Sequence, residues 1–457
     1  MRQLRAGTIS PLDLIDAALA RIAAIDPVVN AVPTLCADRA RDHARRIMAG
    51  SAAAGLLAGL PVLIKDLVEV AGVRTTYGSP IFKDQVPSFS AWQVQRIEAA
   101  DGIVLGKTNT PEFGAGANTF NEVFGITRNP WNLDLTCGGS SGGSAVALAT
   151  GMAWLADGSD LGGSLRTPAS FCGVVGLRPS PGRVPDGPRS LPFGTLSVEG
   201  PMARDVRDAA LFLDALAGHN PRDPLSYDAP AVAYAAAVEQ KPHLRRVAFS
   251  ADLGGITPVD AEVAAICRRA ATRFGELGVA VEETAPDLAT ATATFTTLRA
   301  AQYAAEKAPL LARHRAQLKP EVVWNIEHGL SLTAAAIGEA ERERGQLQLR
   351  MAKFLASYDL LLCPAAIVPP FPVEQRFLAE LNGHRFPSYI DWVSIAYAIT
   401  LTGCPALSLP CGFTAAGLPV GLQMVGRPRG EAGLLAAAAM LEDVLGVAGS
   451  VPIDPRP

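Results

Sequence analysis

The sequence predicts an α/β protein folded as one large domain. Short apolar segments of strand character alternate with segments of helical periodicity along the 457 residues, which is the pattern of helices packed on a β-sheet. Apolar residues make up 49% of the chain and charged residues 18%, so we expect a packed core rather than disorder. We find no short-period repeat and no long linker, which favours a single unit.

Charge and cysteine content exclude several function classes. The formal net charge is −4 and no basic cluster is present, so nucleic acid is not an expected partner. The seven cysteines include no C-x-x-C pair, so we expect neither a disulfide framework nor a zinc site. The first residues form no apolar signal segment, and no apolar run reaches the roughly 20 residues of a membrane span. We therefore expect a soluble, cytoplasmic protein without a membrane partner.

The N-terminal part of the chain predicts one helix and two buried strands. Residues 10–22 predict an amphipathic helix, because Ser suits the N-cap, Pro suits the first helical position and apolar residues follow at helical spacing. Residues 60–64 and 102–107 predict strands. The first strand runs directly into Lys65, where loss of hydration would lower the pKa of the amine. Taken alone, such a lysine is more often exposed or in an ion pair, for example with Asp66.

Two glycine-flanked serine clusters carry the residues best suited to chemistry. They lie at 138–144 and 158–164, within the stretch 137–179. Glycine lets a backbone come close to a ligand, and a serine held in such a loop can meet a carbonyl group with N–H groups beside it. These are the requirements of acyl transfer.

The elements around the serine clusters follow from their composition. Residues 144–150 predict a buried helix, 152–156 a strand and 157–164 a turn. Residues 164–169 are expected to open a helix, with Pro168 in its first turn. A serine at that position faces free N–H groups and the positive end of the helix dipole.

The C-terminal half predicts further strands and a helical segment. Helices are expected at 206–217 and 260–277. Strands are expected at 246–250, 279–282, 360–364, 406–410 and 420–424. Residues 285–356 are rich in Ala, Glu and Arg and predict a helical insertion.

Other chemical interpretations fit the motifs less well. Residues 138–142 match G-x-S-x-G, but that nucleophile elbow requires a preceding strand, and residues 129–136 predict a turn. Its partner would be His384, which lies in a polar loop. The glycine-rich stretch lacks the Lys-Ser/Thr of a phosphate loop, and no H-E-x-x-H pattern supports metal hydrolysis. A serine nucleophile without histidine can use lysine as its base.

Three motifs together closely resemble the amidase signature family. They are P-V-L-I-K-D around Lys65, G-G-S-S-G-G-S around Ser140 and D-L-G-G-S-L-R around Ser164. The resemblance covers nearly the whole chain and is weakest between about 285 and 400. It implies a central mixed, twisted β-sheet covered by helices on both faces, with a catalytic core near 55–205 joined by 357–457.

The resemblance implies a Ser–Ser–Lys triad and assigns the residues around it. Ser164 is expected to be the nucleophile, Ser140 the bridging serine on a cis peptide, and Lys65 the neutral base. Backbone N–H groups expected to form an oxyanion hole belong to Leu161, Gly162, Gly163 and Ser164. Residues expected to support the triad are Ser141, Ser159, Asp160 and Arg166. Residues expected to line the acyl pocket are Gly114, Ala115 and Gly116.

The resulting expectation is a cofactor-free serine hydrolase that cleaves C–N bonds of small amides or carbamates. Anilides and esters remain open as substrates, and the small residues at 114–116 favour a neutral acyl group. An amidotransferase A-type subunit is the main alternative within the family, although residues 195–201 look more like those of stand-alone amidases. A catalytically silent partner in a complex and a Ser–His esterase also remain open. The expected state is a monomer or homodimer.

Overall fold

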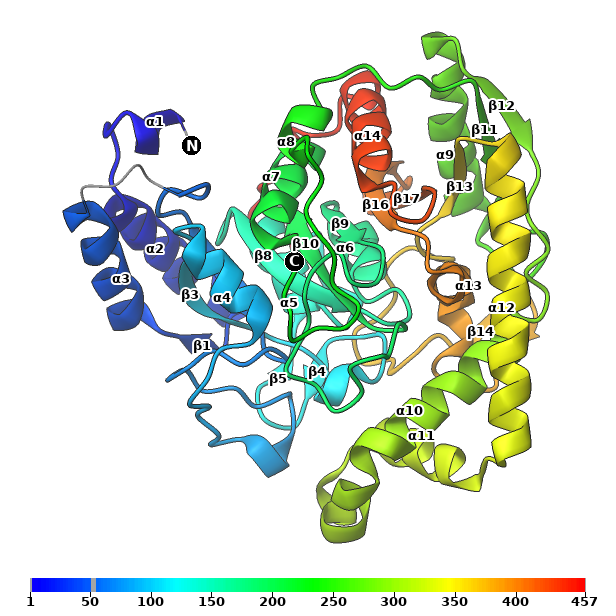
Figure 1. Ribbon diagram of the computed structural model, residues 1–457, viewed down its shortest axis with the longest axis horizontal. Helices are drawn as coiled ribbons and strands as arrows, with labels where there is room; N and C mark the ends of the chain where they lie inside the picture. Colours follow the sequence, from blue (N-terminus) through cyan, green and yellow to red (C-terminus); the bar gives the residue numbers. More distant parts are fainter. Residues whose placement is uncertain (1, 51–54, 457) are drawn as a thin grey trace.

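An eleven-stranded β-sheet organises the computed structural model, which describes residues 2–50 and 55–456 (Figure 1). From one edge to the other, the strands are β1 (Thr34–Leu35), β3 (Ile103–Thr108), β2 (Pro61–Lys65), β8 (Leu155–Asp160), β10 (Val198–Ala203), β9 (Val175–Arg178), β16 (Ala406–Phe413), β17 (Pro419–Val425), β13 (Leu360–Pro364), β11 (Arg246–Phe249) and β12 (Ala280–Glu283). Strand β2 runs parallel to β3 and β8, and β11 runs parallel to β12 and β13. The remaining neighbours are antiparallel, so the sheet is mixed as expected.

Helices cover both faces of this sheet, and their apolar side chains form the core against it. One face packs against α4 (Trp92–Ala99), α7 (Val206–Leu216), α8 (Tyr234–Ala237), α9 (Ala261–Thr272) and α14 (Glu431–Leu445). On the other side of the sheet lie α2 (Pro11–Val29), α3 (Ala37–Ala49), α5 (Gly142–Ala149), α6 (Arg166–Cys172) and α13 (Ser394–Thr402). Helices α10 (Ala291–His314), α11 (Pro320–Ser331) and α12 (Ala334–Ser357) form a further layer, in which α10 packs on α11 and α12, and α10 and α12 pack on α13. A short helix α1 (Arg2–Arg5) precedes them.

Most predicted elements are confirmed, because their determinants are local. Ser10 caps α2 as expected, accepting a hydrogen bond from the backbone N–H of Asp13 at 3.2 Å. The seven strands predicted outside the serine region are found as β2, β3, β11, β12, β13, β16 and β17. The helical segment expected within 285–356 is found as α10, α11 and α12, which pack side by side at one end of the molecule (Figure 1).

Two expectations around the serine clusters were wrong. The strand expected at 152–156 begins only at Leu155, as β8, and it continues to Asp160, so the turn expected at 157–164 is confined to the residues that follow Asp160. The polar residues at its end are held in the strand by antiparallel pairing with β10, where Asp160 lies opposite Val198. Residues 129–136, expected as a turn, form a hairpin of β6 (Arg128–Asn129) and β7 (Asn132–Thr136) outside the main sheet.

Two further hairpins are small and lie outside the main sheet. They are β4 (Phe120–Asn121) with β5 (Gly125–Ile126), and β14 (Glu380–Leu381) with β15 (His384–Arg385). Within residues 2–50 and 55–456, no helix combines the length and the apolar character required to cross a membrane.

Candidate active site

The three sequence motifs meet at one edge of the sheet. Lys65 ends β2 and Asp160 ends the parallel strand β8, so both lie at the carboxyl ends of neighbouring strands. Ser140 lies in the turn before α5, and Ser164 lies in the loop between β8 and α6. The backbone N–H of Ser141 donates to the carbonyl of Ser164 at 3.1 Å, which joins the two serine loops.

Lys65 is fully buried and contacts three serine hydroxyl groups. Its Nζ lies 2.7 Å from Oγ of Ser140, 2.9 Å from Oγ of Ser141 and 2.9 Å from Oγ of Ser159. Burial lowers the pKa of Lys65 to about 8, although nearby carboxyl groups act in the opposite direction. The amine therefore loses its proton far more readily than an exposed lysine, while its partners are alcohols that can give up or receive a proton.

An ion pair between Lys65 and Asp66 does not form. Asp66 pairs with the buried Lys107, whose Nζ lies 3.2 Å from Oδ1 of Asp66. Within the described part of the chain, Lys65 has no carboxylate oxygen within salt-bridge distance. The interpretation of Lys65 as an exposed residue or as the ion-pair partner of Asp66 is thereby contradicted.

Ser140 and Ser164 line the same pocket. The peptide bond between Gly139 and Ser140 is cis, as the family resemblance implies. Ser140 is buried, whereas Ser164 is partly exposed to the pocket. Among the described residues no hydrogen bond joins the two hydroxyl groups directly, so Lys65 holds Ser140 while Ser164 remains open toward a substrate.

Asp160 fixes the loop that carries Ser164. Its carboxylate accepts from Nε and Nη2 of Arg166 at 3.0 and 2.8 Å, and from the N–H groups of Gly163 and Leu165 at 2.9 and 3.1 Å. Arg178 lies 3.3 Å away. Burial alone would raise the pKa of Asp160, but Arg166 and Arg178 hold it well below its usual range. An ionised carboxylate therefore ties the end of β8 to the start of α6.

The hydrogen bond from Gly163 changes the expected oxyanion hole. The N–H of Gly163 is already occupied by Asp160. The N–H groups of Leu161, Gly162 and Ser164 donate to no acceptor within the described ranges, so these three are available to a ligand. Gly163 thus acts on the loop geometry rather than on a ligand in this conformation.

The pocket in front of the serines has a volume of about 140 Å³. Gly114 and Gly116 line it as expected, but Ala115 does not. The methyl group of Ala115 is buried in the core, and its carbonyl oxygen accepts from Nζ of Lys319 at 3.1 Å. Neighbouring residues along an irregular loop point to different sides, so the expectation that Ala115 lines the pocket is wrong.

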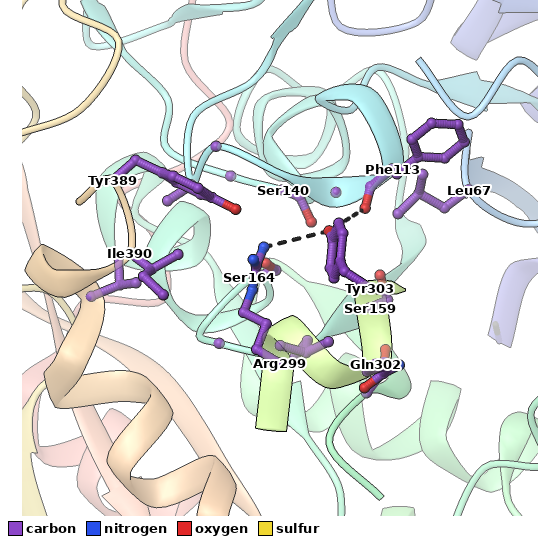
Figure 2. Close-up of a pocket in the computed structure, with 18 of the residues that line it drawn as sticks. Leu67, Phe113, Ser140, Ser159, Ser164, Arg299, Gln302, Tyr303, Tyr389 and Ile390 are labelled. Atoms are coloured by element: carbon purple, nitrogen blue, oxygen red, sulfur yellow. Dashed lines mark hydrogen bonds between the residues drawn. The ribbon is translucent and has the colours of Figure 1, made fainter. Parts of the chain in front are cut away.

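Helix α10 provides the opposite wall, which the sequence motifs did not reveal. Figure 2 shows Arg299 and Tyr303 extending from α10 toward the serines, and Gln302 also lines the pocket. The hydroxyl of Tyr303 donates to the carbonyl of Phe113 at 3.0 Å, which joins α10 to the glycine-rich loop. The polar residues at 299, 302, 303 and 306 repeat at helical spacing, and this pattern was the signal available in the sequence.

Two buried carboxyl groups behind Lys65 were also missed. Oδ1 of Asp157 accepts from the backbone N–H of Lys65 at 2.6 Å, and burial raises the pKa of Asp157 to about 7. Glu199 lies opposite Ser159 in the pairing of β10 with β8, and burial raises its pKa well above the usual value. Neither group lies in a recognisable motif.

The Ser–His alternative is not supported by the geometry. His384 is exposed on the β14–β15 hairpin, where its ring contacts Phe386 at a centroid distance of 5.0 Å, and it does not line the pocket. In the part of the chain that the structure describes, no group of three or more His, Cys, Asp or Glu side chains is arranged to hold a metal ion.

Comparisons with known proteins identify relatives over nearly the whole chain. A sequence model of the family described as Amidase matches residues 13–435. An acylamidase of Rhodococcus erythropolis is 35% identical over 98% of this chain and 94% of its own. The A-type subunit of the glutamyl-tRNA(Gln) amidotransferase of Moorella thermoacetica is 38% identical over 92% of this chain and 91% of its own.

Solved structures are similar over the whole chain. A bacterial aryl acylamidase superposes with a TM-score of 0.90 at 30% identity, covering 99% of this chain and 98% of that protein. A 6-aminohexanoate cyclic dimer hydrolase bound to its substrate gives 0.89 at 30% identity, over 98% and 97%. The chain belongs to the amidase signature family, and it is an enzyme of the class that acts on amides.

Proposed function

We propose that this chain is a stand-alone serine hydrolase that converts an amide and water to a carboxylate and an amine or ammonia. Ser164 is the nucleophile, Ser140 the bridge and Lys65 the base. The single observation that supports this assignment best is the 2.7 Å contact between the fully buried amine of Lys65 and the hydroxyl of Ser140. Small anilides, esters and carbamates fit the same chemistry.

Acylation begins with a proton relay. Lys65 accepts a proton from Ser140, which in turn accepts one from Ser164, and the oxygen of Ser164 attacks the amide carbonyl. Negative charge then develops on the carbonyl oxygen. The available N–H groups of Leu161, Gly162 and Ser164 stabilise it, and removal of one such donor typically costs about 3–4 kcal/mol.

The relay then runs in reverse. Ser140 gives its proton to the leaving nitrogen and recovers one from Lys65, so the C–N bond breaks with a neutral amine as product. Water attacks the acyl group on Ser164 along the same relay, and the carboxylate leaves. Because Ser141 and Ser159 also hold Nζ of Lys65, the base stays in place through both halves.

Covalent labelling tests this proposal directly. A fluorophosphonate probe should modify Ser164, and peptide mass spectrometry should locate the adduct there. Hydrolysis of a panel of p-nitroanilides, primary amides and carbamates then defines the leaving group. A chain that neither labels nor turns over any member of the panel would be a catalytically silent partner, and the proposal would be lost.

An amidotransferase A-type subunit is the second candidate, and the 38% identity to such a protein favours it. The two candidates differ in their need for a partner. The stand-alone hydrolase should release ammonia or amine from small amides as the isolated chain, whereas the amidotransferase component should show preference for glutamine and depend on partner proteins.

A further inference from the structure

Arg299 is a buried cation without an acidic partner. Its side chain is 5% exposed and rises from α10 into the pocket (Figure 2). Its guanidinium donates to Oδ1 of Asn325 and, at 3.4 Å, to the hydroxyl of Tyr303. No Asp or Glu among the described residues lies within salt-bridge distance of it. A buried guanidinium is normally paired with an anion, because an isolated charge is costly in a dry site.

The neighbours of Arg299 do not supply the missing charge. Its guanidinium carbon lies 4.5 Å from the ring centroid of Tyr303 and 5.4 Å from that of Tyr389. Burial raises the pKa of both tyrosines, so both are neutral near physiological pH. Nδ2 of Asn325 donates to the hydroxyl of Tyr389 at 2.6 Å, which fixes the cradle around the guanidinium.

The other charged side chains of the pocket wall compensate each other. Nζ of Lys307 lies 3.2 Å from Oε2 of Glu306, and Gln302 donates to the other oxygen of Glu306 at 3.0 Å. These groups leave the charge of Arg299 unbalanced in the same pocket that Ser164 lines.

We infer that Arg299 binds a carboxylate carried by the substrate, so that the preferred substrates are short amides with an acidic group near the scissile carbonyl. The planar guanidinium matches a carboxylate with two parallel hydrogen bonds. The pocket volume of about 140 Å³ suits a short acyl chain. This inference rests on the proposed function and replaces the neutral acyl group expected from residues 114–116.

Matched substrates of different charge test the inference. Ammonia release from succinamate and from its neutral analogue succinamide should be measured with the wild type, Arg299→Gln and Arg299→Lys. Arg313→Gln is the control, since Arg313 is exposed on the same helix. We expect the wild type to favour succinamate, and Arg299→Gln to reduce this preference by roughly ten- to a hundredfold. Arg299→Lys should retain part of it, and Arg313→Gln all of it.

A labelling competition separates this inference from the proposed function. Succinate should slow fluorophosphonate labelling of Ser164 in the wild type and in Arg313→Gln, but much less in Arg299→Gln. Efficient labelling that succinate does not slow, or a substrate preference that Arg299→Gln leaves unchanged, would overturn the carboxylate site alone. Absence of labelling at Ser164 would overturn the hydrolase and the inference with it.

Discussion

The side-chain nitrogen of Lys65 lies 2.7 Å from the hydroxyl oxygen of Ser140, and both groups are shielded from bulk solvent. In the proposed mechanism desolvation makes this lysine a usable base, because it lowers the pKa of the amine. The contact places the amine directly against the hydroxyl from which the proposed relay takes a proton. Both this pair and the elements that hold it in place are open to direct tests.

The pH dependence of hydrolysis should follow Lys65. Because burial lowers the pKa of this amine to about 8, it is protonated below that pH and cannot accept a proton from Ser140. We expect kcat/KM to fall on the acid side with an apparent pKa near 8, measured between about pH 6 and 10. Lys319→Met is the control, since burial lowers the pKa of Lys319 to about 8 as well. If kcat/KM of Lys319→Met no longer fell on the acid side, the titrating group would be Lys319 and not Lys65.

Substitutions in the triad should have graded effects. Ser164→Ala and Lys65→Met should each reduce kcat by about 10⁴- to 10⁶-fold. In a catalytic unit, the loss of one member costs nearly as much activity as the loss of all members. Ser140→Ala should cause a severe but smaller loss, since it breaks the relay and retains the nucleophile. His384→Ala should retain wild-type activity in the same assay. An inactive His384→Ala variant that is folded by circular dichroism would revive the Ser–His mechanism.

Removal of the charge on Asp160 should destabilise the folded protein. Asp160→Asn keeps the shape of the side chain but leaves Arg166 and Arg178 without their shared buried partner. We expect the free energy of unfolding to fall by about 3–5 kcal/mol in urea denaturation. Asp443→Asn breaks an exposed pair with Arg207 and should change it by less than about 1 kcal/mol. Equal effects of the two substitutions would contradict a supporting role for Asp160.

Gly163 should not tolerate a side chain. Its φ is +110°, and an added Cβ would lie 2.6 Å from Cβ of Ala396. Gly163→Ala should therefore lower both the melting temperature and kcat. Gly345→Ala, at an open position within α12, should instead stabilise the protein by about 0.5–1 kcal/mol. Calorimetry and a standard amide assay compare the two, and wild-type behaviour of Gly163→Ala would show that the loop adapts freely.

Thiol reactivity should be low in the native protein. All seven cysteines are free thiols, and all but Cys36 are buried. Burial also raises the pKa of Cys36 to about 11, which keeps this thiol protonated near neutral pH. We expect slow reaction of at most Cys36 with an aromatic disulfide reagent in buffer, and reaction of all seven after denaturation. Rapid modification of several thiols without denaturant would show that the packed layers open.

Local features of the sequence predicted most of the fold and the residues that the structure brings together around the pocket. Helix caps, apolar periodicity and the three motifs each depend on neighbours in the chain, and the three motifs do converge on one site. The polar end of β8 was missed because pairing with β10, rather than intrinsic propensity, keeps residues 157–160 in a strand.

The remaining differences come from contacts between distant segments. The occupied N–H of Gly163 depends on where the carboxylate of Asp160 points, and no spacing rule shows this. Arg299 comes from a helix with no motif, in the region where the family resemblance is weakest. Its role follows only from its neighbours in space, above all from the lack of an acidic one among the described residues.

The position of α10 outside the sheet has a consequence for how such an enzyme can diversify. The groups proposed to react lie on strand β2 and on the loops that precede α5 and α6, while the facing wall of the pocket is a separate helical layer. Replacement of residues on the inner side of that layer can change which molecules are accepted without disturbing how bonds are broken. Substrate selectivity and catalytic reactivity can therefore evolve at different rates within the same pocket.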